Sequence, residues 1–303
     1  MSLRRQLLNG FLRRVEKPWL ARVTDPALER RAFERAARYF RTPPYTCYLP
    51  DEVGGVPGDW AWVRPARPEI FLYIHGGAHL IGSPRTHRAM VARLAQMTRL
   101  RAFLPDYRLA PEHPFPASLE DARAVWQGLL ARGYAAERIV LGGDSSGGGV
   151  MLALLADLLK TGERPAAAFA FSPWTDLTLS GESFVANAER DVLLPASQAK
   201  TVLGHFLAGQ DPADPRASPL FAEFAGAPPI FLQAARTEIL RDDTLRLADR
   251  MRHQGVQVTV DLWGHLPHVW PIFQGWLPEA DEALRRLAEF IAATLRATRS
   301  GDS

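Results

Sequence analysis

The stretch of the chain that decides the fold is Ile139-Val140-Leu141-Gly142-Gly143-Asp144-Ser145-Ser146-Gly147-Gly148-Gly149, followed by an apolar segment that reaches Lys160. The first three residues predict a β-strand, and the apolar segment predicts a helix. The small residues between them leave room for a sharp turn, since side chains there would clash with a tight backbone. This unit predicts an α/β fold with Ser145 at a strand-to-helix turn.

The same order of strand and helix continues on both sides of this unit. Further strands are expected at residues 46–49, 60–63, 70–74, 102–104, 167–171, 230–234 and 256–262. Helices are expected over about 86–98, 118–132, 241–254 and 278–297. Such alternation predicts a mostly parallel sheet with right-handed crossovers and helices on both faces. Residues 180–226 contain four prolines and no strand pattern, which indicates an insertion above the carboxyl edge of the sheet.

The composition narrows the class of protein. Of the 303 residues, 47% are hydrophobic and 23% are charged, which excludes a mainly disordered chain. The single cysteine, Cys47, excludes an internal disulfide framework and a cysteine-based zinc site. No stretch approaches the ~20 apolar residues needed to cross a bilayer, and no secretory signal is recognisable. We therefore expect a cytoplasmic protein with no stable membrane insertion.

The N-terminal segment is the one locally basic part of the chain. Residues 1–41 carry eleven basic side chains against four acidic ones, whereas the formal net charge of the whole chain is only +3. No nucleic-acid-binding motif accompanies this charge, so no nucleic-acid partner is expected. The segment predicts two helices, broken near Lys17-Pro18 and again near Thr24-Asp25-Pro26.

The first of these helices has apolar residues at helical spacing with arginines between them: Leu3, Leu7, Leu8, Phe11, Leu12 and Val15. The pattern favours a helix packed on the body of the protein. A helix lying on a membrane surface is the alternative.

The turn around Ser145 fits the pattern G-x-S-x-G, which exposes a serine nucleophile at the end of a strand. Centring the pattern on Ser145 puts Gly143 and Gly147 at the required positions, whereas centring it on Ser146 would require glycine at Asp144. A phosphate-binding loop is the competing use of such glycines, but the G-K-[ST] ending is missing.

Donors for a developing oxyanion are expected in a second glycine-rich turn, His75-Gly76-Gly77-Ala78, which follows the strand at 70–74. It resembles the HGGG-type oxyanion loop of lipases and esterases. We assign the oxyanion hole to the backbone N–H groups of Gly76, Gly77 and Ser146. His75 and His79 have the i, i+4 spacing of some metal ligands, but they straddle two glycines and lack an HExxH glutamate. No metal site is expected.

A serine nucleophile needs a base, usually a histidine, and a carboxylate that orients it. In this fold the order along the chain is serine, acid, histidine. His268 follows a predicted strand and directly precedes a new helical segment, so it is the predicted base, with His265 second.

The acid is expected in the loop after the strand at 230–234. Glu238 lies nearest the strand end and is the predicted acid, with Asp242 as the fallback. Asp242 and Asp243 stand where a helix begins, so helix capping accounts for both.

Taken together, these motifs resemble the hormone-sensitive lipase family of α/β-hydrolases, in its bacterial carboxylesterase branch. The resemblance covers roughly residues 45–297. It rests on these segments, which follow the family's order: 75–77 (HGG), 106–117 (DYRLAPEHPFPA), 143–148 (GDSSGG), 172–177 (SPWTDL), 238–243 (EILRDD) and 267–270 (PHVW). Ser146 stands where the family usually has alanine, and Glu238-Ile239 stand where it usually has aspartate and proline.

The resemblance implies one α/β-hydrolase domain over residues 1–303, with a helical cap built from about 1–41 and about 180–226. It also implies a cofactor-independent hydrolase of short- to medium-chain, small-molecule carboxylic esters with the triad Ser145, Glu238 and His268. A homodimer is compatible with the sequence.

Three alternatives to this function stay open. A lactone hydrolase and a deacetylase would use the same mechanism. A non-catalytic small-molecule receptor is a more distant alternative, since plant gibberellin receptors resemble the family without a complete triad.

Overall fold

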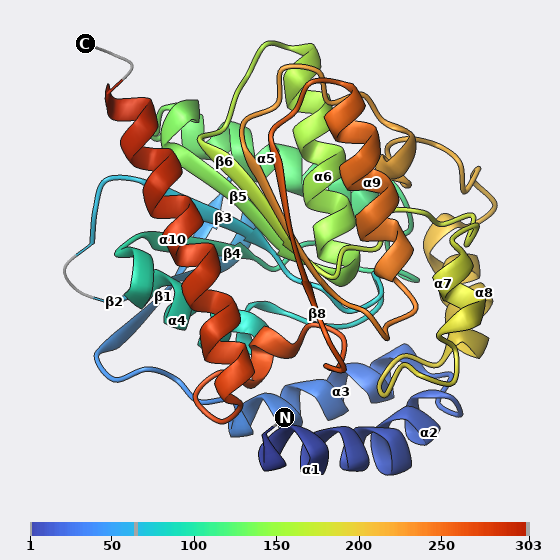
Figure 1. Cartoon of the computed structure of the whole chain (residues 1–303). Helices are drawn as coiled ribbons and strands as arrows, with labels where there is room; N and C mark the ends of the chain where they lie inside the picture. Colours follow the sequence, from blue (N-terminus) through green and yellow to red (C-terminus); the bar gives the residue numbers. More distant parts are fainter. Residues whose placement is uncertain (1, 64–65, 301–303) are drawn as a thin grey trace.

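A single mixed sheet forms the centre of the structure (Figure 1). The computed structural model describes residues 2–63 and 66–300. The eight strands of these residues are β1 (Thr46–Val53), β2 (Val56–Val63), β3 (Ile70–Ile74), β4 (Arg101–Pro105), β5 (Ile139–Asp144), β6 (Ala167–Phe171), β7 (Ile230–Ala235) and β8 (Val258–Trp263). Their order in the sheet is β1-β2-β4-β3-β5-β6-β7-β8. The pairs β1–β2 and β2–β4 are antiparallel, and the remaining pairs are parallel, as predicted.

Helices cover both faces of this sheet, which the strand sequences require. The helices are α1 (Leu3–Phe11), α2 (Lys17–Leu20), α3 (Pro26–Ala36), α4 (Pro84–Thr98), α5 (Ala117–Ala131), α6 (Ser145–Lys160), α7 (Glu182–Ala186), α8 (Ala199–Leu207), α9 (Arg241–His253) and α10 (Pro278–Ser300). In β3, Ile70, Leu72 and Ile74 pack into one apolar cluster with α5, α6 and α9, whereas Phe71 and Tyr73 pack into another with α4 and α10. This alternation follows the two-residue period of a strand.

The N-terminal helices agree with the sequence at one break and differ at the other. Asp25 caps α3 as its position before Pro26 suggests, with its Oδ1 accepting the Ala27 N–H at 2.9 Å. The predicted break at Lys17-Pro18 is wrong, because α1 continues into α2 through a π-helical turn over Leu12–Glu16. The Lys17 N–H reaches the Leu12 carbonyl, and this wider turn accommodates a proline that lacks an N–H.

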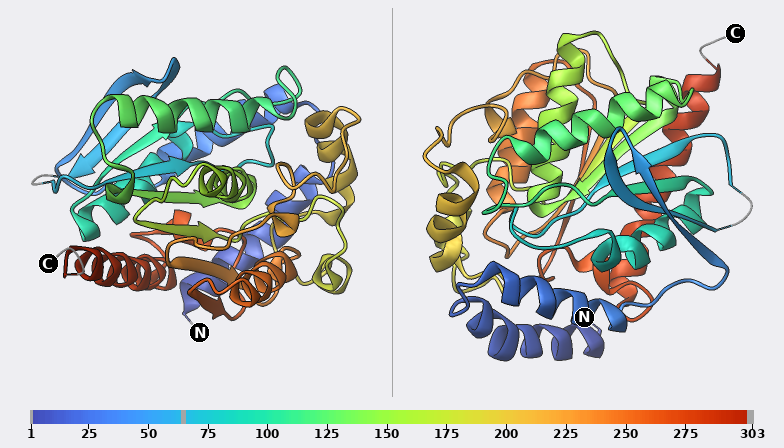
Figure 2. Two further views of the ribbon diagram at one scale, coloured as in Figure 1. Left: turned by 90° about the horizontal axis from the view of Figure 1, so that it is seen from above. Right: turned by 180° about the vertical axis from the view of Figure 1, so that it is seen from behind.

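Residues 180–226 contain no strand, in agreement with the sequence, and carry α7, α8 and two short 3-10 turns. Figure 2 shows α7 and α8 at one side of the molecule, next to the layer formed by α1, α2 and α3. No helix in the part of the chain that the structure describes is long and apolar enough to cross a membrane.

Candidate active site

Ser145 lies at the junction between β5 and α6, without an intervening loop. Its φ of 51° is left-handed, a conformation that costs a non-glycine residue energy and that the tight junction imposes. Gly147 packs so closely that a Cβ there would lie 2.1 Å from the His75 carbonyl oxygen. The glycine of the pattern is therefore required by the approach of the turn to the neighbouring loop.

His268 meets Ser145 from the loop that follows β8. Its Nε2 lies 2.8 Å from Ser145 Oγ, and its Nδ1 lies 2.7 Å from Glu238 Oε2. All three side chains are buried, with Ser145 the most accessible at 9% of its surface. The structure thus joins a hydroxyl, an imidazole and a carboxylate in one row of hydrogen bonds. His268 lies 123 residues after Ser145 and 30 residues after Glu238 in the sequence.

Hydrogen bonds that the sequence did not predict hold Glu238 in its position next to His268. Ser172 Oγ donates to Glu238 Oε1 at 3.0 Å, and the Ala235 N–H donates to the same oxygen. Asn187 donates its side-chain amide to the Glu238 carbonyl oxygen at 3.0 Å. Ser172 stands in the motif 172–177, so the motif was visible, but its partner 66 residues away was not.

The pKa of His268 is set by opposing effects. Burial lowers it, but the hydrogen bond and charge of Glu238, together with the charges of Asp191 and Asp144, outweigh the burial. The net result is a pKa above the ordinary 6.5. Asp191 is itself buried, and its carboxylate accepts the N–H groups of Leu193, Leu194 and Ile239.

The alternative residues for base and acid lie elsewhere. His265 is exposed, and Asn9 donates to its carbonyl oxygen. Asp242 accepts the Ser183 N–H at 2.7 Å, and Asp243 accepts the N–H groups of Thr175 and Asp176. The expectation that Asp242 and Asp243 cap α9 is wrong, since neither side chain accepts a backbone N–H of the first turn of that helix. Both instead hold the chain that follows β6.

The backbone N–H of Gly76, an expected oxyanion donor, is already used in another hydrogen bond. The Gly76 N–H donates to Asp144 Oδ1 at 3.0 Å, so the assignment of Gly76 to the oxyanion hole is corrected. Among the described residues, no acceptor is recorded for the N–H groups of Gly77, Ala78 and Ser146. Because Asp144 is 68 residues from Gly76 in sequence, the spacing of the motif could not predict this hydrogen bond.

A hydrogen bond joins the loop that carries the Gly77 and Ala78 N–H groups to α6, the helix that begins at Ser145. Ser146 Oγ accepts the His79 N–H at 3.1 Å, and both residues are buried. Ala78 and His79 have φ values of 54° and 63°, a conformation that turns the loop sharply. The His79 ring stacks on Phe206 of α8 with 3.6 Å between ring centroids. The hydroxyl that distinguishes Ser146 from alanine therefore has a defined partner.

Next to Ser145 lies a second buried carboxylate–histidine pair. Asp144 Oδ2 lies 3.3 Å from His87 Nε2, and Asp144 Oδ1 accepts the Tyr73 hydroxyl at 2.8 Å and the Gly76 N–H. Burial raises the pKa of Asp144, but the effects of His87, Tyr73 and the Gly76 N–H are larger and bring the pKa below its ordinary value. The His75 ring is stacked on His87, and burial lowers the pKa of His75 to about 3. This pair fixes the loop that begins at His75 to the strand that ends at the nucleophile.

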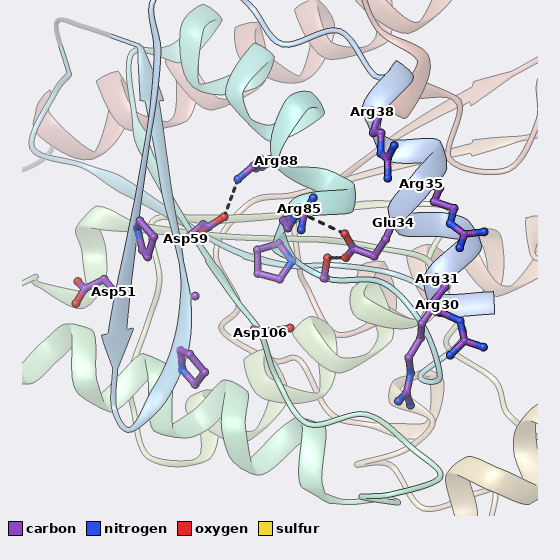
Figure 3. Close-up of a pocket in the computed structure, with 15 residues that line it drawn as sticks. Arg30, Arg31, Glu34, Arg35, Arg38, Asp51, Asp59, Arg85, Arg88 and Asp106 are labelled. Atoms are coloured by element: carbon purple, nitrogen blue, oxygen red, sulfur yellow. Dashed lines mark hydrogen bonds and ion pairs between the residues drawn. The ribbon is translucent and has the colours of Figure 1, made fainter. Parts of the chain in front are cut away.

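A cavity of about 770 Å³ lies apart from these groups, between α3, β2 and the start of α4 (Figure 3). Six arginines and four acidic residues line it, and the triad residues do not. Three of its arginines are paired, Arg30 with Glu112, Arg85 with Glu34 and Arg88 with Asp59. This mixed charge does not match the chemistry expected of the serine site.

Comparisons with known proteins agree with the geometry. A family model described as alpha/beta hydrolase fold matches residues 71–272. The chain is 35% identical over 288 residues to an acetyl-hydrolase of Streptomyces hygroscopicus, covering 91% of this chain and 93% of the relative. It is 35% identical to an esterase of Acinetobacter venetianus, covering 88% of each. A crystal structure of an esterase from the bacterial hormone-sensitive lipase family is 37% identical and superposes with a TM-score of 0.92, covering 97% and 99% of the two chains.

Proposed function

Because the chain belongs to the hormone-sensitive lipase family of α/β-hydrolases and is a serine carboxylesterase, we propose that it hydrolyses short- to medium-chain esters through Ser145, His268 and Glu238. The observation that carries the proposal is the continuous hydrogen-bonded chain, 2.8 Å from Ser145 Oγ to His268 Nε2 and 2.7 Å from His268 Nδ1 to Glu238. These are the distances at which a base can take a hydroxyl proton and a carboxylate can stabilise the resulting imidazolium.

The reaction proceeds in two halves. His268 Nε2 takes the proton of Ser145 as Oγ bonds to the ester carbonyl carbon, and Glu238 stabilises the charge on the ring. The alkoxy C–O bond then breaks, and the leaving oxygen takes the proton from His268. A water molecule attacks the acyl-enzyme while His268 accepts its proton. Collapse of this second intermediate returns the proton to Ser145 Oγ and releases the carboxylic acid.

We assign the oxyanion to the N–H groups of Gly77, Ala78 and Ser146. This assignment replaces Gly76 by Ala78, because the Gly76 N–H is already bonded to Asp144. The N–H groups of Ala78 and Gly77 belong to the loop that packs on the nucleophile, where a Cβ on Gly76 would lie 2.9 Å from Ser145 Cβ. Preorganised donors of this kind commonly supply ~2.7–4 kcal/mol each to the transition state.

The N-terminal segment and residues 180–226 are proposed as one cap over the site. Arg30 of α3 donates to the carbonyl oxygens of Leu80 and Ala110, and Phe206 of α8 stacks on His79. Both parts of the cap therefore contact the segment that follows the oxyanion loop. An apolar cluster that includes Leu80, Trp174, Phe206 and Ile239 surrounds this contact, which supports a substrate with an apolar acyl or alcohol group.

The test is covalent labelling with a fluorophosphonate, followed by mapping of the adduct. We expect a single label on Ser145 and loss of both label and activity in Ser145→Ala. A label elsewhere, or full activity in that variant, would contradict the proposed nucleophile.

Substrate class is tested with a panel of p-nitrophenyl esters from acetyl to decanoyl, together with lactones and acetylated sugars. A 35% identical relative named acetyl-hydrolase favours the acetyl end of the series and keeps the deacetylase as a second candidate. Faster turnover of lactones than of every ester would overturn the ester proposal.

A further inference from the structure

The N-terminal helical segment Leu3–Leu20 has two apolar faces, although packing on the protein needs only one. The inner face carries Leu8 and Leu12, which are 8% and 4% exposed. They pack in a cluster with Val192, Leu266 and Trp270. The prediction that this helix packs on the body of the protein is confirmed for this face.

The outer face carries an apolar stripe that the fold leaves uncovered. It consists of Leu3, Leu7, Phe11 and Val15, which recur every fourth residue and are 70%, 62%, 54% and 52% exposed. Isolated exposed apolar residues are normal, but an aligned row of four on one helix marks an interaction surface. Figures 1 and 2 show α1 at the outer edge of the molecule, with nothing packed beyond it.

The charge around this stripe has one sign. Residues 2–24 contain six basic side chains and a single acidic one, Glu16. Arg4, Arg13 and Lys17 donate to backbone carbonyl oxygens of the body, which anchors the helix without neutralising the charge. Arg14 and Arg22 are exposed, with no hydrogen-bond or ion-pair partner recorded among the described residues.

We propose that the outer face of Leu3–Leu20 is a docking surface for a lipid surface that carries anionic headgroups. A helix with aromatic and aliphatic residues on one stripe and arginines beside it lies in the plane of such a surface, with the apolar side chains inserted and the guanidinium groups at the headgroups. This adds to the ester hydrolysis proposed above and does not depend on it.

A second copy of the chain fits this face less well. A two-fold contact through one stripe would bring the unpaired arginines of both copies together, and like charges at an interface oppose association. Anionic headgroups, in contrast, supply the missing counter-charge.

Docking here would act close to the catalytic loop. The inner face of the same helix packs on Leu266 and Trp270, two residues to either side of His268, and Asn9 donates to the His265 carbonyl oxygen at 3.1 Å. A docked molecule would therefore hold the loop that carries the catalytic base one helix away from the lipid surface, where ester substrates with acyl chains gather.

The test measures co-sedimentation of the full chain with vesicles of phosphatidylcholine alone and with 30% phosphatidylglycerol. We expect binding to the anionic vesicles, weaker binding at high salt, and at least a tenfold lower partition coefficient for the double variant Leu7→Glu/Phe11→Glu. The matched control is Val185→Glu, because Val185 is 79% exposed and lies on α7, a different helix from the one that carries the stripe. The substituted side chains lie on the solvent side of the proposed cap, each more than half exposed, so all variants should keep wild-type turnover of a water-soluble acetyl ester. This separates the test from that of the catalytic proposal.

Equal binding of wild type and double variant to anionic vesicles would overturn the proposal, as would no binding by the wild type. Analytical ultracentrifugation tests whether a second copy of the chain binds this face instead. A dimer that Leu7→Glu/Phe11→Glu converts to a monomer, with no vesicle binding, would assign the stripe to self-association instead.

Discussion

Among the residues that the structure describes, two carboxylate–histidine pairs are buried in the core, and the ring of one of them reaches the proposed nucleophile. In both pairs the carboxylate and the ring are buried, Glu238 with His268 and Asp144 with His87. The far nitrogen of His268 faces Ser145 Oγ at the edge of the buried region, whereas that of His87 faces Thr86 Oγ1, which is fully buried and hydrogen-bonded to the Ser83 carbonyl oxygen. Under the proposed mechanism, pairing with a carboxylate does not by itself make a histidine catalytic, and the access of the third group to substrate decides the role.

The largest expected effect comes from exchanging the two rings for asparagine. His268→Asn should lower kcat by about 10⁴-fold or more, because the base is lost. His87→Asn should keep kcat within about tenfold and instead lower the free energy of unfolding by about 1–3 kcal/mol, since Asp144 loses a buried partner. Steady-state kinetics and urea unfolding of both variants measure the contrast. Similar losses of kcat in both would remove the distinction between the pairs.

The two carboxylates should separate in the same way, with a smaller difference. Glu238→Gln should lower kcat by about 10³–10⁴-fold, since the imidazolium loses its stabilising charge. Asp144→Asn should destabilise the fold by about 3–5 kcal/mol, because Asp144 holds His87, Tyr73 and the Gly76 N–H together. Its kcat should fall less than that of Glu238→Gln. The measurements are kcat at saturating ester and the midpoint of urea unfolding, and an unchanged midpoint in Asp144→Asn would contradict the structural role.

The pH dependence should report the charged groups around His268. Its pKa is raised above the ordinary 6.5, because the hydrogen bond and charge of Glu238 outweigh the effect of burial, so protonation should remove the base at a higher pH than it would for a free imidazole. We expect kcat/KM to fall as the pH drops through a value above 6.5. In Glu238→Gln this acid limb should move to lower pH, because the opposing charge is removed while burial still lowers the pKa. Profiles of kcat/KM from pH 5 to 9 test this, and a flat profile between pH 5 and 8 would exclude His268 as the base.

The sequence predicted the main elements because each has a local signal. The strand–turn–helix unit around Ser145, the alternating strands and helices, and the helix break near Asp25-Pro26 all depend on residues next to one another in the chain. The contact between Glu238 and His268 was predictable from their order and from their place after strand ends, which the parallel topology brings to one edge.

Two of the failures share a cause, since they depend on partners distant in sequence. The Gly76 N–H is taken by Asp144, 68 residues away, and Asp243 is taken by the N–H groups of Thr175 and Asp176. No local spacing reveals such bonds. The continuous helix through Pro18 has a different explanation. Proline usually breaks a helix, but here the helix continues because the turn before Pro18 is widened to a π-helical turn.

The smallest expected effect concerns the hydroxyl of Ser146, which links the nucleophile's helix to the oxyanion loop. Ser146→Ala leaves the buried His79 N–H without its acceptor and loosens the loop that carries the Gly77 and Ala78 donors. We expect kcat to fall by about three- to tenfold with little change in KM, because oxyanion donors act mainly in the transition state. The matched control is Ser183→Ala, whose buried hydroxyl bonds to the Ile239 carbonyl oxygen and the Asp242 N–H, and which should lower stability while keeping kcat. Equal losses of kcat in the two variants would mean that the Ser146 hydroxyl has no specific effect on the oxyanion loop. The position of that loop would then depend on the Asp144–His87 pair.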